Sequence, residues 1–317
     1  MDDNKSSGGF LENISEGGLP QLIAGPAGKA ISRLIGAGVE IPAAWLEQKA
    51  RAIRDETEAR STVMKSLAER SASLGLEDTA LLNRGLDNLL GRAYRDQQNR
   101  EAVAIETMRV IGEDASEPTG EGPSDDWMNV FEGLAANASS ENLRQLFGKV
   151  LAGEIRKPGE FSLSTLQLVS IIDSALARII ERVAAHVWDG AIVPREAVGD
   201  SIPYDDLLAL EDIGFLSLGA GMLHQNKVAN ESGIIGYRAP GVGLMAEFEP
   251  GQKLSLPAYP LSRSGRELVK ILSRNPKIAA AAKALWKLDP KRVFVGVPIP
   301  FGEGFTLHSP REISKSE

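Results

Sequence analysis

The stretch ENLRQLFGKVLAGEIRKPGEFSLSTL, residues 141–166, carries the clearest helical pattern in the chain. Ser139 or Ser140 can cap its first turn, and Pro158-Gly159 ends the helix. Between these limits, apolar side chains recur at spacings of three and four residues, the period of one helical face: Leu143, Leu146, Phe147, Val150, Leu151 and Ile155. The pattern predicts a helix that buries one apolar face in a helical bundle.

A second helix is predicted after this loop, beginning at Ser162 or Ser164 and continuing to about Trp188. Two capped helices joined by a short loop form an antiparallel pair. The two serines are interpreted as helix caps, because a nucleophilic serine needs a neighbouring base and a glycine-rich elbow, and neither is present here.

The chain upstream of this bundle is also predicted to be helical. A small-residue apolar segment occupies residues 20–38, a charged helix covers 43–73, and a further helical run covers 78–111. The charged helix has a thin apolar seam, which is typical of a helix that packs against a partner helix or its own copy. We therefore expect self-association through Ile53 and Leu67.

Glycine and proline become frequent after Asp189, and short β-rich runs appear. Strands are predicted at 233–237, 243–248 and 293–299, with helices at 205–213, 264–273 and 276–288. The predicted fold class is mainly α: an N-terminal helical arm and helical bundle, followed by a C-terminal α+β winged-helix-like domain. The predicted parts are a flexible tail, an arm, a linker, a bundle and the winged-helix-like domain, at 1–18, 19–112, 113–126, 127–190 and 191–317.

The composition of the 317-residue chain narrows its functional class. The chain contains no cysteine, which excludes disulfides, thiolate nucleophiles and cysteine-based metal sites. No stretch reaches the roughly 18 consecutive apolar residues of a transmembrane helix, and the acidic, polar N-terminus is unlike a signal peptide. We expect a cytoplasmic protein, with a position at the membrane periphery as the alternative.

No pattern of residues predicts a phosphate-binding loop. The segment around Gly28-Lys29 has a superficial likeness to one. The motif, however, requires a glycine where this chain has Ile23 and a serine or threonine where it has Ala30. The match is attributed to chance, and no cofactor is expected.

The titratable residues likewise predict no catalytic or metal site. Glu154 lies beside the apolar stripe and is a candidate general base, but a helix cap or an ion pair with Arg144 or Arg156 is the preferred interpretation. The three histidines are far apart in sequence and have no ligand spacing: His186, His224 and His308. We expect a protein that is not an enzyme and has no small-molecule substrate.

Residues 142–166, NLRQLFGKVLAGEIRKPGEFSLSTL, also resemble the hallmark segment of a bacterial family known as "domain of unknown function 2806". The resemblance extends over about residues 19–275 and is specific in 127–172. It implies a layout similar to that of families found among prophages and phage-resistance loci. No catalytic residues are established for the family, so none are assigned to this chain.

Local charge conflicts with total charge in the C-terminal part. The chain carries a net charge of −8, which argues against bulk binding of nucleic acid. Nevertheless, nine Lys and Arg lie between residues 263 and 292, against Glu267 and Asp289. Seven of them form the predicted anion or nucleic-acid patch: Arg263, Arg266, Lys270, Arg274, Lys277, Lys283 and Lys287. The helix before the predicted wing carries four carboxylates within 205–212, and phosphate would repel them.

These observations leave three functional hypotheses open. The first is a non-enzymatic protein-interaction or assembly protein, part of a phage-resistance or prophage-encoded system. The second is a nucleic-acid-binding regulator that uses the basic patch at 263–292. The third is a membrane-acting effector that uses residues 19–46, because an amphipathic segment with a flanking tryptophan can lie in a bilayer interface.

Overall fold

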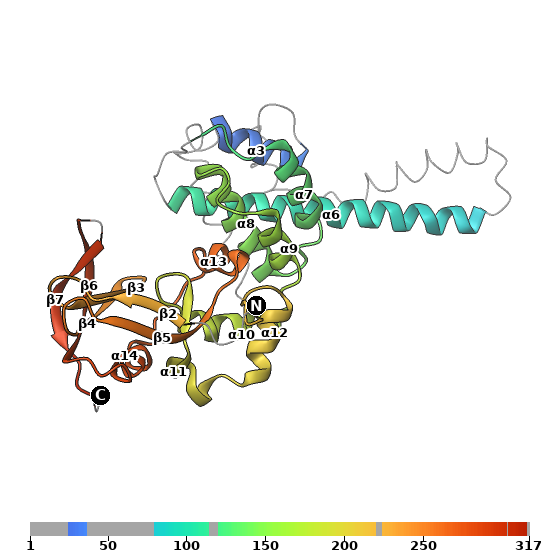
Figure 1. The fold of residues 1–317 in the computed structure, drawn as a ribbon. Helices are drawn as coiled ribbons and strands as arrows, with labels where there is room; N and C mark the ends of the chain where they lie inside the picture. Colours follow the sequence, from blue (N-terminus) through green and yellow to red (C-terminus); the bar gives the residue numbers. More distant parts are fainter. Residues whose placement is uncertain (1–24, 37–78, 114–119, 220–223, 303, 316–317) are drawn as a thin grey trace. The chain divides into compact units, whose positions relative to one another are not determined.

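The computed structural model describes residues 25–36, 79–113, 120–219, 224–302 and 304–315, without the side chains of 79–83, 86 and 200 (Figure 1). The chain divides into two compact units, residues 1–166 and 167–317. Ile53 and Leu67, predicted to mediate self-association, lie outside the described residues.

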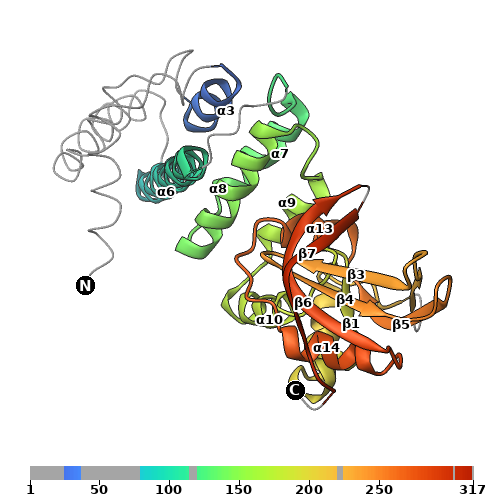
Figure 2. The ribbon, with the colours of Figure 1, turned by 90° about the vertical axis from the view of Figure 1, so that its left-hand side faces the viewer.

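The described part of the first unit is helical. Its described helices are α3 (Gly25–Ile35), α6 (Thr79–Glu113), α7 (Asp125–Ala135) and α8 (Glu141–Arg156). Helices α6 and α8 lie side by side in Figure 2, and among the described helices of the unit they form the most extensive pair. A Cβ atom on Gly148 would come within 2.5 Å of the Cβ of Glu106, so the missing side chain permits the close approach of these two helices.

Aromatic side chains fill the centre of this unit. Phe131 is fully buried and stacks on Trp127, with 4.9 Å between the ring centroids. It also meets Phe147 edge to face at 5.6 Å. Four residues of the predicted stripe of α8, Phe147, Val150, Leu151 and Ile155, are buried, and Leu143 and Leu146 are half-buried. Ser140 caps the helix by accepting a hydrogen bond from the backbone N–H of Leu143.

Helix α3 is buried within the first unit through its small and apolar residues. Ala27, Ile31 and Leu34 are at most 4% exposed. Arg33, on the other face, pairs with Asp125 and with Glu132 of α7. The membrane hypothesis for residues 19–46 stays a prediction, since only part of that range is described.

The predicted single helix from residue 162 to 188 is wrong. The structure has two helices there, α9 (Leu163–Ser170) and α10 (Ser174–Ala184). The carboxylate of Asp173 accepts hydrogen bonds from the backbone N–H groups of Ala175 and Leu176. This side-chain cap starts a new helix in the middle of a continuous apolar pattern.

The second unit contains two antiparallel sheets (Figure 1). One sheet has the order β1-β5-β2, and the other has the order β3-β4-β6-β7. The strands span Ile192–Pro194 (β1), His224–Val228 (β2), Ile234–Ala239 (β3), Val242–Glu247 (β4), Lys253–Pro260 (β5), Arg292–Phe301 (β6) and Gly304–Glu312 (β7). Alternating burial along β5 marks the face that it turns to the core.

The second unit also contains helices, two of which, α11 and α14, pack against strands. After α10 come α11 (Arg195–Val198), a 3-10 turn η1 (Gly199–Ser201), α12 (Tyr204–Asp212), α13 (Arg263–Val269) and α14 (Ile278–Trp286). Helix α14 contacts β4 and β6 through its alanine-rich face. The core there includes Trp188, Leu244, Leu285 and Val293.

The predicted fold class, mainly α, is wrong, because the protein is α+β. The strands predicted at 233–237, 243–248 and 293–299 are confirmed as β3, β4 and β6. Strands β5 and β7 were not predicted, because Pro257, Pro260 and Pro310 resemble loop residues in sequence. The strands predicted at 233–237 and 243–248 pair with each other within the four-stranded sheet, and the winged-helix-like assignment is not confirmed.

Candidate anion-binding site

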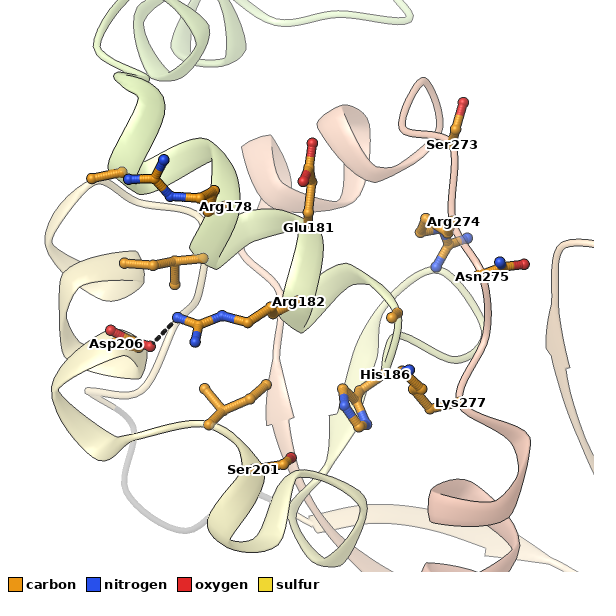
Figure 3. A pocket seen from close by; sticks show the side chains of 14 residues that line it. Arg178, Glu181, Arg182, His186, Ser201, Asp206, Ser273, Arg274, Asn275 and Lys277 are labelled. Carbon is orange, nitrogen blue, oxygen red and sulfur yellow. Dashed lines mark hydrogen bonds and ion pairs between the residues drawn. The ribbon is translucent and has the colours of Figure 1, made fainter.

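An open groove of about 840 Å³ lies in the second unit, between α10, the start of α12 and the segment 273–277. Figure 3 shows its charged side chains, which come from parts of the chain about 90 residues apart. The basic residues that line it are Arg178, Arg182, His186, Arg274 and Lys277, and the acidic ones are Glu181 and Asp206. Fully charged Lys, Arg and carboxylate groups give this groove a net positive charge.

Helix α10 places three of these residues in one row. Ile180, Val183 and Ala184 form its buried face, while Arg178 and Arg182 are exposed and four residues apart. His186 follows one turn later, just beyond the helix end. Residues at this spacing lie above one another on a helix, so the row faces the groove.

One cation of the row is neutralised within the protein. Arg182 forms an ion pair with Asp206 at the start of α12, drawn as a dashed line in Figure 3. By contrast, Arg178, Arg274 and Lys277 make no ion pair with any residue that the structure describes. These three side chains are therefore available to an external anion.

Arg274 is the most constrained of these cations. It is partly buried, and its Nη1 donates a hydrogen bond to the carbonyl oxygen of Val187 at 3.1 Å. Its Nε is buried and has no hydrogen-bond partner among the described atoms. Burial lowers the pKa of the Arg274 guanidinium. A partly desolvated cation without a counter-ion is costly, and a bound anion would reduce that cost.

His186 is a buried polar side chain at the same groove. It is 7% exposed, and its Nδ1 has no hydrogen-bond partner among the described atoms. Burial lowers the pKa of His186, and the nearby charge of Lys277 lowers it further. The imidazole is therefore neutral at neutral pH, with unused hydrogen-bonding capacity beside the groove.

Only two of the seven predicted patch residues line this groove, Arg274 and Lys277. Arg263 pairs with Glu267 at 2.8 Å, and Arg266 donates to the carbonyl oxygen of Leu261. The remaining three are exposed and lie elsewhere: Lys270 after α13, and Lys283 and Lys287 in or directly after α14.

Arg178, Arg182 and His186 are not among the predicted site residues. The signal for them is the four-residue spacing of basic side chains opposite the apolar stripe of α10. The charge distribution also favours the second unit over the first as the place where an anion binds. Residues 167–317 contain 17 Lys and Arg and 17 Asp and Glu. The entire net charge of −8 is therefore carried by residues 1–166.

The acidic residues of α12 are partly engaged within the protein. Asp206 pairs with Arg182, and a carboxylate oxygen of Glu211 accepts a hydrogen bond from the backbone N–H of Leu218 at 2.8 Å. Asp205 and Asp212 are exposed. The helix thus keeps a negative surface next to the positive groove.

Glu154, the candidate general base, makes local backbone contacts instead. Its carboxylate accepts hydrogen bonds from the N–H of Gly159 at 2.7 Å and of Phe161 at 2.9 Å. Burial raises the pKa of Glu154, and these backbone donors oppose that rise. Arg144 donates hydrogen bonds to the side chain of Asn99 and the carbonyl oxygen of Ala138. Arg156 donates one to the carbonyl oxygen of Val110. The carboxylate organises the loop after α8.

The other two histidines are exposed, His224 on β2 and His308 on β7. In the described parts of the chain, no group of three His, Asp or Glu side chains is placed to hold a metal ion. Within the same parts, no helix has both the length and the apolar character needed to cross a membrane.

Comparison with known families confirms the resemblance over part of the chain. Residues 84–198 match the model described as "Protein of unknown function (DUF2806)". The matched range covers most of α6, all of α7–α10 and the first strand of the second unit. No curated protein and no solved structure gives a significant match.

Proposed function

Starting from a family match that assigns no activity, we propose that the protein binds nucleic acid, without catalysing a reaction, through the groove lined by α10 and residues 273–277. The observation that carries the proposal is the set of cations without ion-pair partners, Arg178, Arg274 and Lys277, which line one groove together with the buried His186. Phosphate oxygens are anionic acceptors that suit all four groups.

The dimensions of the groove favour a chain of phosphates over a single phosphate. Arg178 and His186 are eight positions apart, which corresponds to about 12 Å along a helix axis. The groove is open and about 840 Å³ in volume. An extended polyanion can contact Arg178 at one end of such a row and Lys277 with His186 at the other, whereas a single small anion contacts one end.

The test is fluorescence anisotropy of a labelled oligonucleotide with the full chain, at several salt concentrations. Wild-type affinity should fall steeply as salt rises, because bound phosphates release counter-ions. The variant Arg178→Glu/Lys277→Glu removes two proposed phosphate contacts. The negative slope of log affinity against log salt should therefore become shallower by about 2.

The matched control is Lys283→Glu/Lys287→Glu, which makes the same change in charge at exposed positions that do not line the groove. This control should bind nearly as well as the wild type. Binding that is absent at low salt, or an equal loss in both double variants, would refute the groove as the contact surface.

The pH dependence of binding provides an independent check on His186. A phosphate beside the imidazole would favour its protonated form, so binding would take up a proton. Affinity should therefore increase as the pH falls from about 7.5 to about 6. A His186→Gln variant should lose this increase while keeping the salt dependence.

A second candidate function is assembly through protein contacts, within a phage-resistance or prophage-encoded system. The observation in its favour is an exposed apolar row on β6, formed by Val297, Ile299 and Phe301 at 53%, 41% and 73% exposure. Apolar side chains gathered on one strand face are typical of interaction surfaces. A tagged pull-down from the native bacterium, with and without nuclease, separates the two candidates.

In that pull-down, a stoichiometric protein partner that survives nuclease and is lost with Phe301→Ser would support assembly. Recovery of nucleic acid alone, or loss of every partner on nuclease treatment, would support the groove and count against assembly.

A further inference from the structure

A second hollow adjoins the cationic groove. It has a volume of about 460 Å³ and includes Arg195, Glu196, Tyr204 and Tyr259 in its lining. Ile202, which is 4% exposed, lines both this hollow and the groove. The two spaces therefore adjoin the same short segment before α12.

The residues of this hollow suit a flat aromatic ligand. Tyr204 is 63% exposed at the first position of α12, an unusual exposure for a large ring. Tyr259 is held in β5, where it pairs with Val193 of β1. An aromatic ring can stack on a nucleobase, and a guanidinium can stack on the base or donate hydrogen bonds to it. A carboxylate can accept hydrogen bonds from the amino groups of the base.

We propose that this hollow receives an unpaired nucleobase of a single strand whose neighbouring phosphates lie in the groove between α10 and residues 273–277. This inference rests on the proposed nucleic-acid-binding function and specifies its ligand. A base inside a duplex is stacked between its neighbours and cannot enter such a hollow, whereas a base in a single strand can.

The charges around the site favour a single strand for a second reason. The groove carries a net positive charge, and the adjoining α12 exposes Asp205 and Asp212. A duplex presents the phosphates of two strands over a broad surface, and these carboxylates would repel the second strand. One strand can follow the cations while its bases turn towards the tyrosines.

The experiment compares three probes of equal length with the full chain: oligodeoxythymidylate, an abasic oligomer with the same phosphates, and a duplex. The wild type should bind the thymidylate about five- to hundredfold more tightly than the abasic strand, the usual effect of one stacked base. Tyr204→Ala should remove this difference without changing affinity for the abasic strand, and Tyr204→Phe should retain it.

Tyr94→Ala is the matched control, since Tyr94 is an exposed tyrosine of α6 in the other unit, at 45% exposure. It should leave all three affinities unchanged. Equal affinity for thymidylate and abasic strands, or an unchanged preference in Tyr204→Ala, would overturn the base-binding hollow. If Arg178→Glu/Lys277→Glu still weakened both strands, the proposed function would survive that result. Absence of salt-dependent binding to any probe would overturn both.

Discussion

Replacing Gly148 by alanine tests the packing of α6 against α8. The added Cβ would lie 2.5 Å from the Cβ of Glu106 and 3.1 Å from the backbone nitrogen of Thr107. Carbon atoms in contact prefer about 3.5–4.0 Å, so the helices must separate by about 1 Å. The neighbours that lose contact include Phe147 and Leu151, both fully buried.

The expected cost follows from two opposing effects. Overpacking of this kind typically costs about 1–3 kcal/mol, and alanine recovers up to about 1 kcal/mol through its higher helix propensity. We expect Gly148→Ala to lower the free energy of unfolding of the first unit by about 1–2 kcal/mol. The melting temperature should fall by roughly 2–8 °C for a unit of this size.

Gly85→Ala is the matched control in the same unit. Gly85 also lies in a helix interior, but a Cβ there would meet nothing within 4 Å. The same substitution should therefore stabilise the unit by about 0.5–1 kcal/mol. If Gly148→Ala lowers and Gly85→Ala raises the free energy of unfolding, the effect of the helix contact is separated from that of helix propensity.

Hydrogen exchange with mass spectrometry is the suitable assay, because the four tryptophans are shared between the two units and fluorescence would mix their signals. Exchange should accelerate in α6 and α8 of Gly148→Ala and leave α14 unchanged. Equal or greater protection in α8 of Gly148→Ala than in the wild type would refute the close-packing argument.

Three further predictions concern single side chains. Glu154→Ala leaves two backbone N–H groups, of Gly159 and Phe161, without their acceptor. The free energy of unfolding of the first unit should fall by about 2–4 kcal/mol, and proteolysis at this loop should accelerate. An unchanged cleavage rate would contradict the loop-organising role. His186 has a lowered pKa in the folded state, so its contribution to stability is present above pH 6.5 and lost as the pH falls through the folded pKa. Between pH 7.5 and pH 5.5, the melting temperature of His186→Gln should therefore fall less than that of the wild type. An identical fall in both proteins would exclude this histidine as a cause. Arg33→Met leaves the acidic partners on α7 unpaired. Because Arg33 is partly exposed, the free energy of unfolding should fall by about 1 kcal/mol, and by less in high salt. Urea titrations at two salt concentrations measure this, and a loss that does not depend on salt would mean that packing, and not charge, is responsible.

Local patterns were sufficient wherever neighbouring residues decide the structure. The stripe of α8 and its Ser140 cap, and the β-rich runs that became β3 and β4, were predicted because helical period, capping and β propensity act over a few residues. The continuous apolar pattern after Ser162 was misleading. One carboxylate, that of Asp173, interrupted it by capping α10.

The sequence by itself therefore determined the helical first unit, the absence of cysteine chemistry and the resemblance that residues 84–198 bear out. Only the tertiary structure decided that the protein is α+β and that Arg178 and Lys277 line one groove. The physical reason is the range of the interactions. Period and capping act within one or two turns, whereas strand pairing and the approach of side chains about 100 residues apart depend on how the whole unit packs.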